Sequence, residues 1–193
     1  MTSAVTPYTT RLLTPDTWDD FAALVEANNG VWGGCWCIGF HPEGISKDST
    51  VAGNREAKLA HVHNGTIHQV LVYNDGRCVG WCQYGPPAEV ATIKNPKAYE
   101  KGLAELPDWR IGCLFTGSGS RGKGVARAGV AAVLAAPAHS CSAHGSGTRM
   151  TARAVVAVGM RSMLLARVSR AGQNPIEPWP RPPRGSQLPC SPR

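Results

Sequence analysis

The stretch from Trp109 to Ala126 reads WRIGCLFTGSGSRGKGVA and passes through three kinds of local structure. Its first part is apolar almost throughout, which predicts a buried strand over residues 109–116. Four small residues then lead into RGKGVA, residues 121–126. A helix is expected to run from there to Ala136, because Pro137 cannot continue it.

A strand that ends in a glycine-rich turn and opens a helix leaves several main-chain N–H groups without partners. Such a turn can bind phosphate, and the helix dipole favours the negative charge. Gly122 and Gly124 remove the Cβ atoms that would hold a phosphate away from the main chain, and Arg121 and Lys123 add positive charge. The pattern favours a diphosphate-bearing cofactor over an ordinary glycine-containing helix start.

The residues before this stretch predict two helices and three strands. Thr14-Pro15 is a good helix start, and apolar residues then recur at helical spacing. Asn74-Asp75-Gly76 permits positive φ and predicts an antiparallel hairpin. The expected elements are a strand over residues 8–13, helices over 15–28 and 54–63, and hairpin strands over 68–73 and 77–84. Residues 33–42 are expected to be buried and irregular or briefly extended, and a helical turn is expected over residues 99–106.

The string RGKGVA resembles the R/Q-x-x-G-x-G/A signature of the GNAT superfamily of acetyl-CoA-dependent N-acetyltransferases. It matches through Arg121, Gly124 and Ala126. The order helix, helix, hairpin, strand, signature loop, helix is similar to the first two-thirds of a GNAT domain. Gly34-Cys35-Trp36-Cys37 also resembles a segment of some bacterial members. The resemblance covers residues 8–136.

The resemblance implies an α/β fold with a mixed, mostly antiparallel sheet flanked by helices. It implies acetyl-CoA as the cofactor and acetyl transfer to a primary amine of a small molecule or a protein. A degenerate relative without catalysis, which binds CoA weakly or not at all, is the alternative. The residues that it assigns to the cofactor are Leu114, Phe115 and Thr116 for the pantetheine arm, and Arg121, Gly122, Lys123, Gly124, Val125 and Ala126 for the pyrophosphate.

Direct attack of an amine on a thioester needs a base for the ammonium and a donor for the developing oxyanion. Glu105 and Asp108 precede the strand over residues 109–116 and are candidates that would act through water. Ordinary surface carboxylates are the favoured interpretation, so no catalytic residue is assigned.

The net charge of +7 lies entirely in the C-terminal third. Residues 137–193 carry eight arginines, no lysine and a single acid, Glu177, whereas residues 1–136 are neutral overall. We therefore divide the chain into an acetyl-CoA-binding domain, residues 1–136, and a tail rich in Arg, Pro and Ala, residues 137–193. The tail has no aromatic side chain besides Trp179, which favours a solvated, largely disordered appendage over a nucleic-acid-binding segment.

The tail does not match the rest of a GNAT domain, which continues with a fifth strand, a helix and two closing strands. None of these is recognisable after Pro137, and only residues 152–169 are compatible with a helix. The fold is therefore expected to be atypical and incomplete at its C-terminal end. A shift of reading frame in GC-rich coding DNA is one hypothesis for the change in composition.

Seven cysteines without paired spacing argue against a disulfide framework and favour reduced thiols in the cytoplasm. The first ten residues lack the basic flank and apolar run of a secretory signal, and no window is apolar enough to span a membrane. Cys35, Cys37 and His41 lack the usual spacing of zinc ligands, so core packing is favoured for them and for Cys113, and no metal is expected. His61 and His63 are expected to be exposed.

Overall fold

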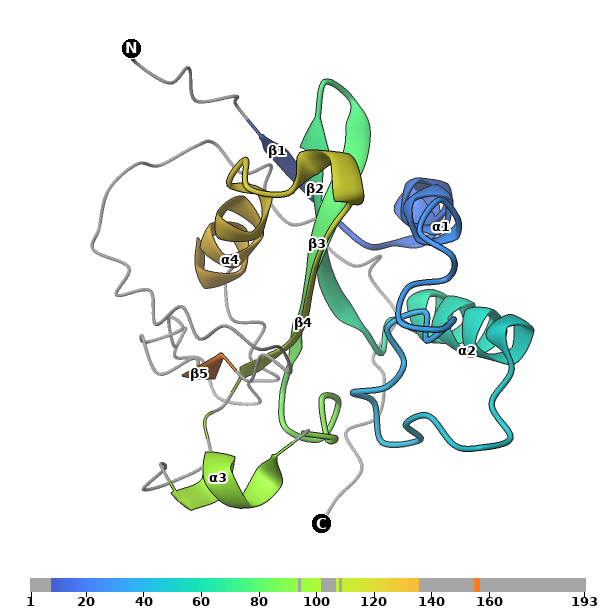
Figure 1. Ribbon diagram of the computed structural model, residues 1–193. Helices are drawn as coiled ribbons and strands as arrows, with labels where there is room; N and C mark the ends of the chain where they lie inside the picture. Colours follow the sequence, from blue (N-terminus) through green and yellow to red (C-terminus); the bar gives the residue numbers. More distant parts are fainter. Residues whose placement is uncertain (1–7, 94, 102–106, 108, 136–154, 157–193) are drawn as a thin grey trace, which may run out of the picture.

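The computed structural model describes residues 8–93, 95–101, 107, 109–135 and 155–156, and a single sheet organises them. The strands lie in the order β1-β2-β3-β4-β5 (Figure 1). The first four are antiparallel to their neighbours, and β5 is parallel to β4. Their bounds are Thr9–Leu12 for β1, His68–Asn74 for β2, Arg77–Gly85 for β3, Arg110–Thr116 for β4 and Val155–Val156 for β5.

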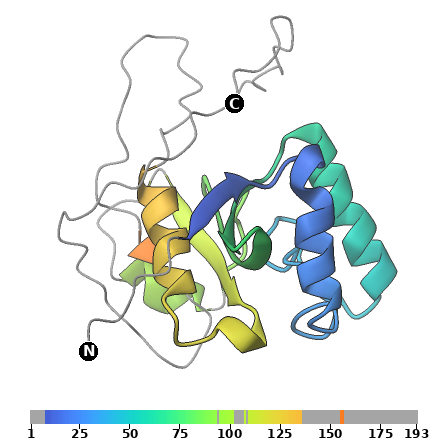
Figure 2. The ribbon, with the colours of Figure 1, turned by 90° about the horizontal axis from the view of Figure 1, so that it is seen from above.

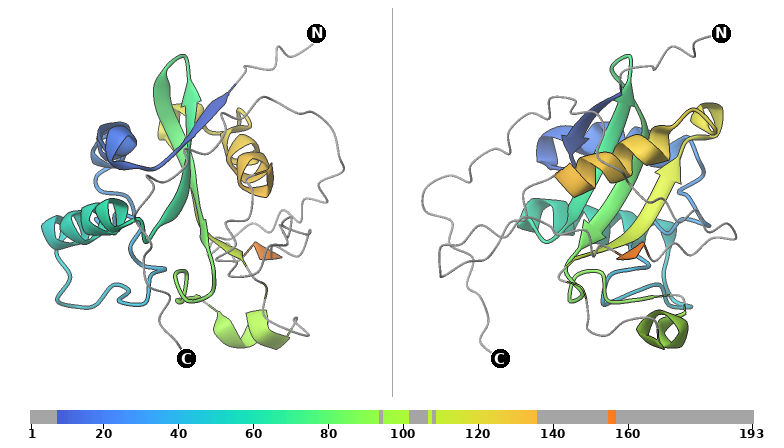
Figure 3. Two further views of the ribbon diagram at one scale, coloured as in Figure 1. Left: turned by 180° about the vertical axis from the view of Figure 1, so that it is seen from behind. Right: turned by 90° about the vertical axis from the view of Figure 1, so that its left-hand side faces the viewer.

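Helices cover both faces of this sheet. The helices α1, Trp18–Glu26, and α2, Val51–Asn64, lie on one face, and α4, Val125–Ala135, lies on the other (Figure 2). The short helix α3, Pro96–Lys101, lies near the end of the sheet at which β4 begins (Figure 3). No helix in the described ranges is both long and apolar enough to cross a membrane. The predicted α/β fold, a mostly antiparallel sheet between helices, is confirmed for this part of the chain.

The predicted hairpin is confirmed, and its turn is the one that the sequence indicates. Asp75 and Gly76 have φ angles of 49° and 75°, and the strands β2 and β3 pair from Asn74 and Arg77 onward. One irregularity follows. Tyr73 pairs with Cys78, but Val72 pairs with Gly80, so that Val79 is an extra residue in β3.

The first helical region begins as a 3₁₀ turn, Pro15–Thr17, which passes directly into α1. The N–H of Thr14 donates to Oγ1 of Thr17 at 2.9 Å, and that hydroxyl donates to the carbonyl of Leu12 at 2.7 Å. These bonds fix the angle at which the chain leaves β1. The second predicted helix is also confirmed, starting three residues earlier than expected, and Gly65 ends it with a φ of 64°.

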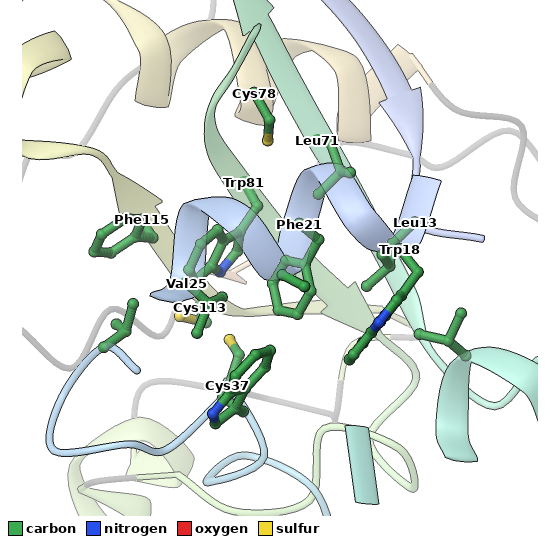
Figure 4. Close-up of a cluster of buried hydrophobic side chains, with 14 of the residues drawn as sticks. Leu13, Trp18, Phe21, Val25, Cys37, Leu71, Cys78, Trp81, Cys113 and Phe115 are labelled. Atoms are coloured by element: carbon green, nitrogen blue, oxygen red, sulfur yellow. The ribbon is translucent and has the colours of Figure 1, made fainter. Parts of the chain in front are cut away.

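The larger hydrophobic core lies between the sheet and the helices α1 and α2 (Figure 4). Phe21 of α1 packs edge-on against Trp81 of β3, with ring centroids 5.1 Å apart, and Trp81 stacks on Phe115 of β4 at 4.4 Å. A smaller cluster on the other face packs α4 against the sheet. Its buried members are Val70, Cys82, Tyr84, Ile111, Ala132 and Val133.

Gly80 lets β3, β4 and α4 approach closely, which predicts a large effect for a single methyl group. A Cβ at this position would lie 2.6 Å from the carbonyl oxygen of Phe115 and 2.6 Å from a methyl group of Val125. Because both neighbours are held by the fold, Gly80→Ala is expected to lower the free energy of unfolding by about 1–3 kcal/mol in urea denaturation. Gly119→Ala, where a Cβ would have no atom within 4 Å, is the control and should change little.

Candidate functional site

The connection between β4 and α4 has the conformation that its glycines permit. Gly122 has a φ of 75° and Gly124 a φ of 93°, a region in which other residues are strained. A Cβ built on either glycine would have no atom within 4 Å, so the space beside both is open. Glycine is therefore required at these two positions by the positive φ angles and not by close packing.

The N–H groups at the start of α4 have no acceptors among the described residues. From Arg121 to Arg127 none of them makes a hydrogen bond there, and the first that does is that of Ala128, which donates to the carbonyl of Gly124 at 3.0 Å. A run of unpaired N–H groups at the positive end of a helix dipole favours an anion.

Two contacts fix the loop from outside and from within. The hydroxyl of Tyr8 donates to the carbonyl of Lys123 at 2.9 Å, which ties the loop to the residue before β1. The ammonium of Lys123 donates to the carbonyl of Gly119 at 3.0 Å. Arg121 and Lys123 are both exposed, so their charges face solvent beside the open space. The loop carries positive charge and is held without contributions from its own N–H groups.

The strand register shows which main-chain groups of β4 point away from β3. The N–H of Gly117 donates to the carbonyl of Val79 at 2.9 Å, and Phe115 lies opposite Trp81. Because hydrogen-bonded and non-bonded pairs alternate along an antiparallel ladder, the polar main-chain groups of Phe115 point to β3. Those of Leu114 and Thr116 point to the other side.

The strand β5 occupies that other side only at the beginning of β4. Arg110 pairs with Val155 and Ile111 with Val156, in parallel. In the described part of the chain no strand continues alongside Leu114 and Thr116, so the second half of this edge is unpaired there. A 3₁₀ turn, Ser118–Ser120, joins this edge to the glycine loop.

This strand corrects the sequence analysis, which recognised no strand after Pro137 and treated residues 152–169 as the one segment compatible with a helix. Val155 and Val156 form a strand, so both expectations are wrong at these two residues. Two β-branched residues favour an extended main chain, and β4 offers them an unpaired edge. The remaining residues of the predicted tail, with the helix and the disorder expected there, lie outside the described residues.

A second group of polar side chains is buried beneath α2, on the face of the sheet that α1 and α2 cover. The ammonium of Lys58 is fully buried and donates to Oε1 of Gln69 at 2.8 Å. Gln69 lies opposite Gln83, and Gln83 lies opposite Cys113 of β4. Sγ of Cys37 donates to Oε1 of Gln83 at 2.9 Å. A row of polar groups therefore crosses three strands inside the larger core.

Burial sets the titration of this group. It lowers the pKa of Lys58, against the effect of the thiols Cys37 and Cys113 nearby. Burial alone would raise the pKa of Cys37, but the neighbouring thiol of Cys113 and the charge of Lys58 outweigh it and lower that pKa. Burial, together with the charges of Lys58 and His61, lowers the pKa of His41 to about 3, so His41 is neutral at physiological pH.

A histidine–carboxylate pair lies at the start of β2. Glu89 accepts from the main-chain N–H of His68 at 2.8 Å and lies 2.6 Å from Nδ1 of the same residue. The ring of Trp109 meets His68 edge-on, with centroids 5.0 Å apart. The pair holds the connection after β3 against the sheet, and it lies two strands away from the unpaired edge of β4.

The predicted cofactor residues lie along one path from β4 through the loop to α4, but Phe115 is not available to a pantetheine arm, because its main-chain groups point to β3 and its side chain lies in the larger core. Within that path Val125 is buried, and only its main chain faces the loop. The candidates Glu105 and Asp108 lie outside the described residues. Cys37 and Cys113 are core residues, as predicted. The expectation that His61 is exposed is wrong, because it packs beside His41 with ring centroids 4.5 Å apart; His63 is exposed as expected.

No family model and no curated protein matches the chain. Solved structures that it resembles include a ribosomal-protein-alanine N-acetyltransferase from Brucella melitensis biovar Abortus 2308, a protein from Desulfovibrio desulfuricans described as an acetyltransferase of the GNAT family, and an N-acetyltransferase from Staphylococcus aureus Mu50. The identities are 14%, 18% and 13%, and the TM-score is 0.39 in each case. Each match covers 66% of this chain, and the chain spans 69%, 64% and 64% of the three proteins.

Proposed function

We propose that the protein binds acetyl-CoA and transfers its acetyl group to a primary amine of a small molecule or a protein. The observation that carries the proposal is the presence of two unpaired main-chain surfaces on either side of one turn. The 3₁₀ turn Ser118–Ser120 joins the free edge of β4 at Leu114 and Thr116 to the N–H groups from Arg121 to Arg127, within the described part of the chain.

The fit to the cofactor follows from the chemistry of its two ends. A pantetheine arm carries amide groups that can pair with a strand edge, and a pyrophosphate needs several N–H donors and a positive field. Leu114 and Thr116 would hold the arm. The loop amides from Arg121 to Ala126 would hold the pyrophosphate, with the charges of Arg121 and Lys123 beside it. When bound, the cofactor supplies the thioester that the amine attacks.

The proposal is tested by titrating the full chain with acetyl-CoA in a calorimeter and then measuring release of the CoA thiol with a panel of amines. Saturable binding and amine-dependent thiol release are expected. Ligand at about 100 times its Kd should stabilise the fold by about 2.7 kcal/mol. Binding without release for any amine would favour a protein that binds the cofactor but does not catalyse transfer. Absence of binding would overturn the proposal.

A further inference from the structure

Three side chains with metal-binding groups meet where the connection between α1 and α2 lies against α2. They are His41, Glu43 and His61, and one ligand atom from each lies within 4.8 Å of the other two. Nε2 of His61 lies 2.6 Å from Oε1 of Glu43. The set is separate from the loop between β4 and α4, so an inference about it does not depend on the proposed function.

The strongest indication is an unpaired atom on His41. This residue is completely buried, and its Nδ1 makes no hydrogen bond with any described residue. A buried nitrogen without a partner is energetically costly, so native structures rarely contain one without a reason. A bound cation would be such a reason, because a neutral imidazole offers it a lone pair.

The other ring nitrogens are held in the way that metal-binding histidines require. Nδ1 of His61 lies 2.7 Å from Oγ1 of Thr66, and its Nε2 faces Oε1 of Glu43, so a metal ion would replace the hydrogen bond between these two groups. Nε2 of His41 lies 2.7 Å from the side-chain amide of Gln83, which leaves Nδ1. Each ring therefore has one nitrogen held by a residue outside the three proposed ligands, and such support by a second group orients ligating imidazoles.

The amide of Gln83 can serve both states of His41. In one orientation its NH₂ donates to Nε2 of His41, and its oxygen accepts from the thiol of Cys37. After a half-turn, its oxygen accepts from Nε2–H of His41 and its NH₂ donates to sulfur. The second orientation frees the Nδ1 lone pair of His41 for a metal.

We propose that His41 through Nδ1, Glu43 through its carboxylate and His61 through Nε2 bind a divalent transition-metal ion, with Zn²⁺ as the reference ion. Two imidazoles and a carboxylate suit zinc and its neighbours better than Mg²⁺ or Ca²⁺. Three protein ligands leave a fourth position of a tetrahedral ion for water. The side chains of Glu43 and His61 are 43% and 24% exposed, so an ion can reach the site from solvent.

The ion would fasten a part of the chain that regular secondary structure does not hold. His41 and Glu43 belong to the connection between α1 and α2, which contains turns but neither helix nor strand over residues 27–50. His61 is in α2. Binding therefore cross-links this connection to a helix and should raise the thermal stability of the protein.

The test uses the full chain, stripped with a chelator and titrated with Zn²⁺ in a calorimeter, with melting followed in parallel. One ion per chain and a higher melting temperature are expected. Glu43→Gln and His61→Gln should each weaken binding about tenfold or more. The matched control is His63→Gln, an exposed histidine of the same helix, which should bind as the unaltered protein does. His41→Asn can fail to fold because the residue is buried, so the test does not depend on it.

The cysteines provide the competing explanation, since thiolates also bind zinc. Titration with Co²⁺ separates the two, because thiolate ligands give strong near-ultraviolet charge-transfer absorption and imidazole and carboxylate ligands do not. The expected cobalt spectrum lacks that absorption. The proposal is overturned by a thiolate spectrum, by unchanged affinity in Glu43→Gln and His61→Gln, or by absence of binding.

Discussion

Replacing Lys58 with alanine is expected to lower the free energy of unfolding by about 3–5 kcal/mol, because it leaves a cavity and an unpaired amide oxygen in the core. The ammonium is fully buried, donates to Gln69 at 2.8 Å and lies 5.4 Å from the ring centre of Phe21. Alanine leaves a cavity, and Oε1 of Gln69 loses its hydrogen-bond donor. Nε2 of Gln69 already makes no hydrogen bond with a described residue.

Urea denaturation of two further variants separates the cavity from the lost hydrogen bond. Lys58→Met fills most of the volume but still leaves the Gln69 amide unpaired, so it should recover only part of the loss. Lys58→Met combined with Gln69→Leu removes both polar partners and should be more stable than Lys58→Met alone. Lys47→Ala, at an exposed lysine, is the control. A loss below about 1 kcal/mol in Lys58→Ala would show that the buried ammonium is not needed for stability.

Gly124→Val is expected to weaken acetyl-CoA binding about 100-fold, or nearly 3 kcal/mol. A β-branched residue at a φ of 93° is strained, so the loop must change its shape to accept valine. That change would turn away the N–H groups that the proposed function assigns to the pyrophosphate. Calorimetric titration with acetyl-CoA measures the effect.

The matched control for this prediction is Gly119→Val. Gly119 lies in the same connection and, like Gly124, would have no atom within 4 Å of an added Cβ, but it has no positive φ. Its affinity should stay close to that of the unaltered protein. Equal affinities in Gly124→Val and Gly119→Val would mean that the loop conformation does not decide cofactor binding.

The hairpin shows which features the local sequence predicts and which it does not. The turn at Asp75 and Gly76 could be predicted, and an uninterrupted ladder from this turn would place Gln69 opposite Cys82. The extra residue at Val79 shifts the register, so that Gln69 faces Gln83 instead. Gly80, an isolated glycine within a strand, was the available signal for a bulge, but it does not specify which residue is the extra one.

The polar groups beneath α2 were missed for a similar reason. Lys58 lies in a helix that the sequence predicts, but few apolar residues mark the buried face of that helix. Two glutamines within otherwise apolar strands were the available signal that polar groups are buried there. Likewise His41, Glu43 and His61 are brought together by the path of the chain between α1 and α2, which no sequence period describes.

Sequence alone determined the strand, the glycine loop and the helix that follows it, since each depends on φ angles, turn residues and apolar runs within a few neighbouring positions. Tertiary structure decided which main-chain groups of β4 stay unpaired, where β5 joins the sheet and which polar side chains meet in the interior. Those features depend on register and on contacts between distant segments. Their energies are set by burial and pairing in three dimensions, which local propensities do not contain.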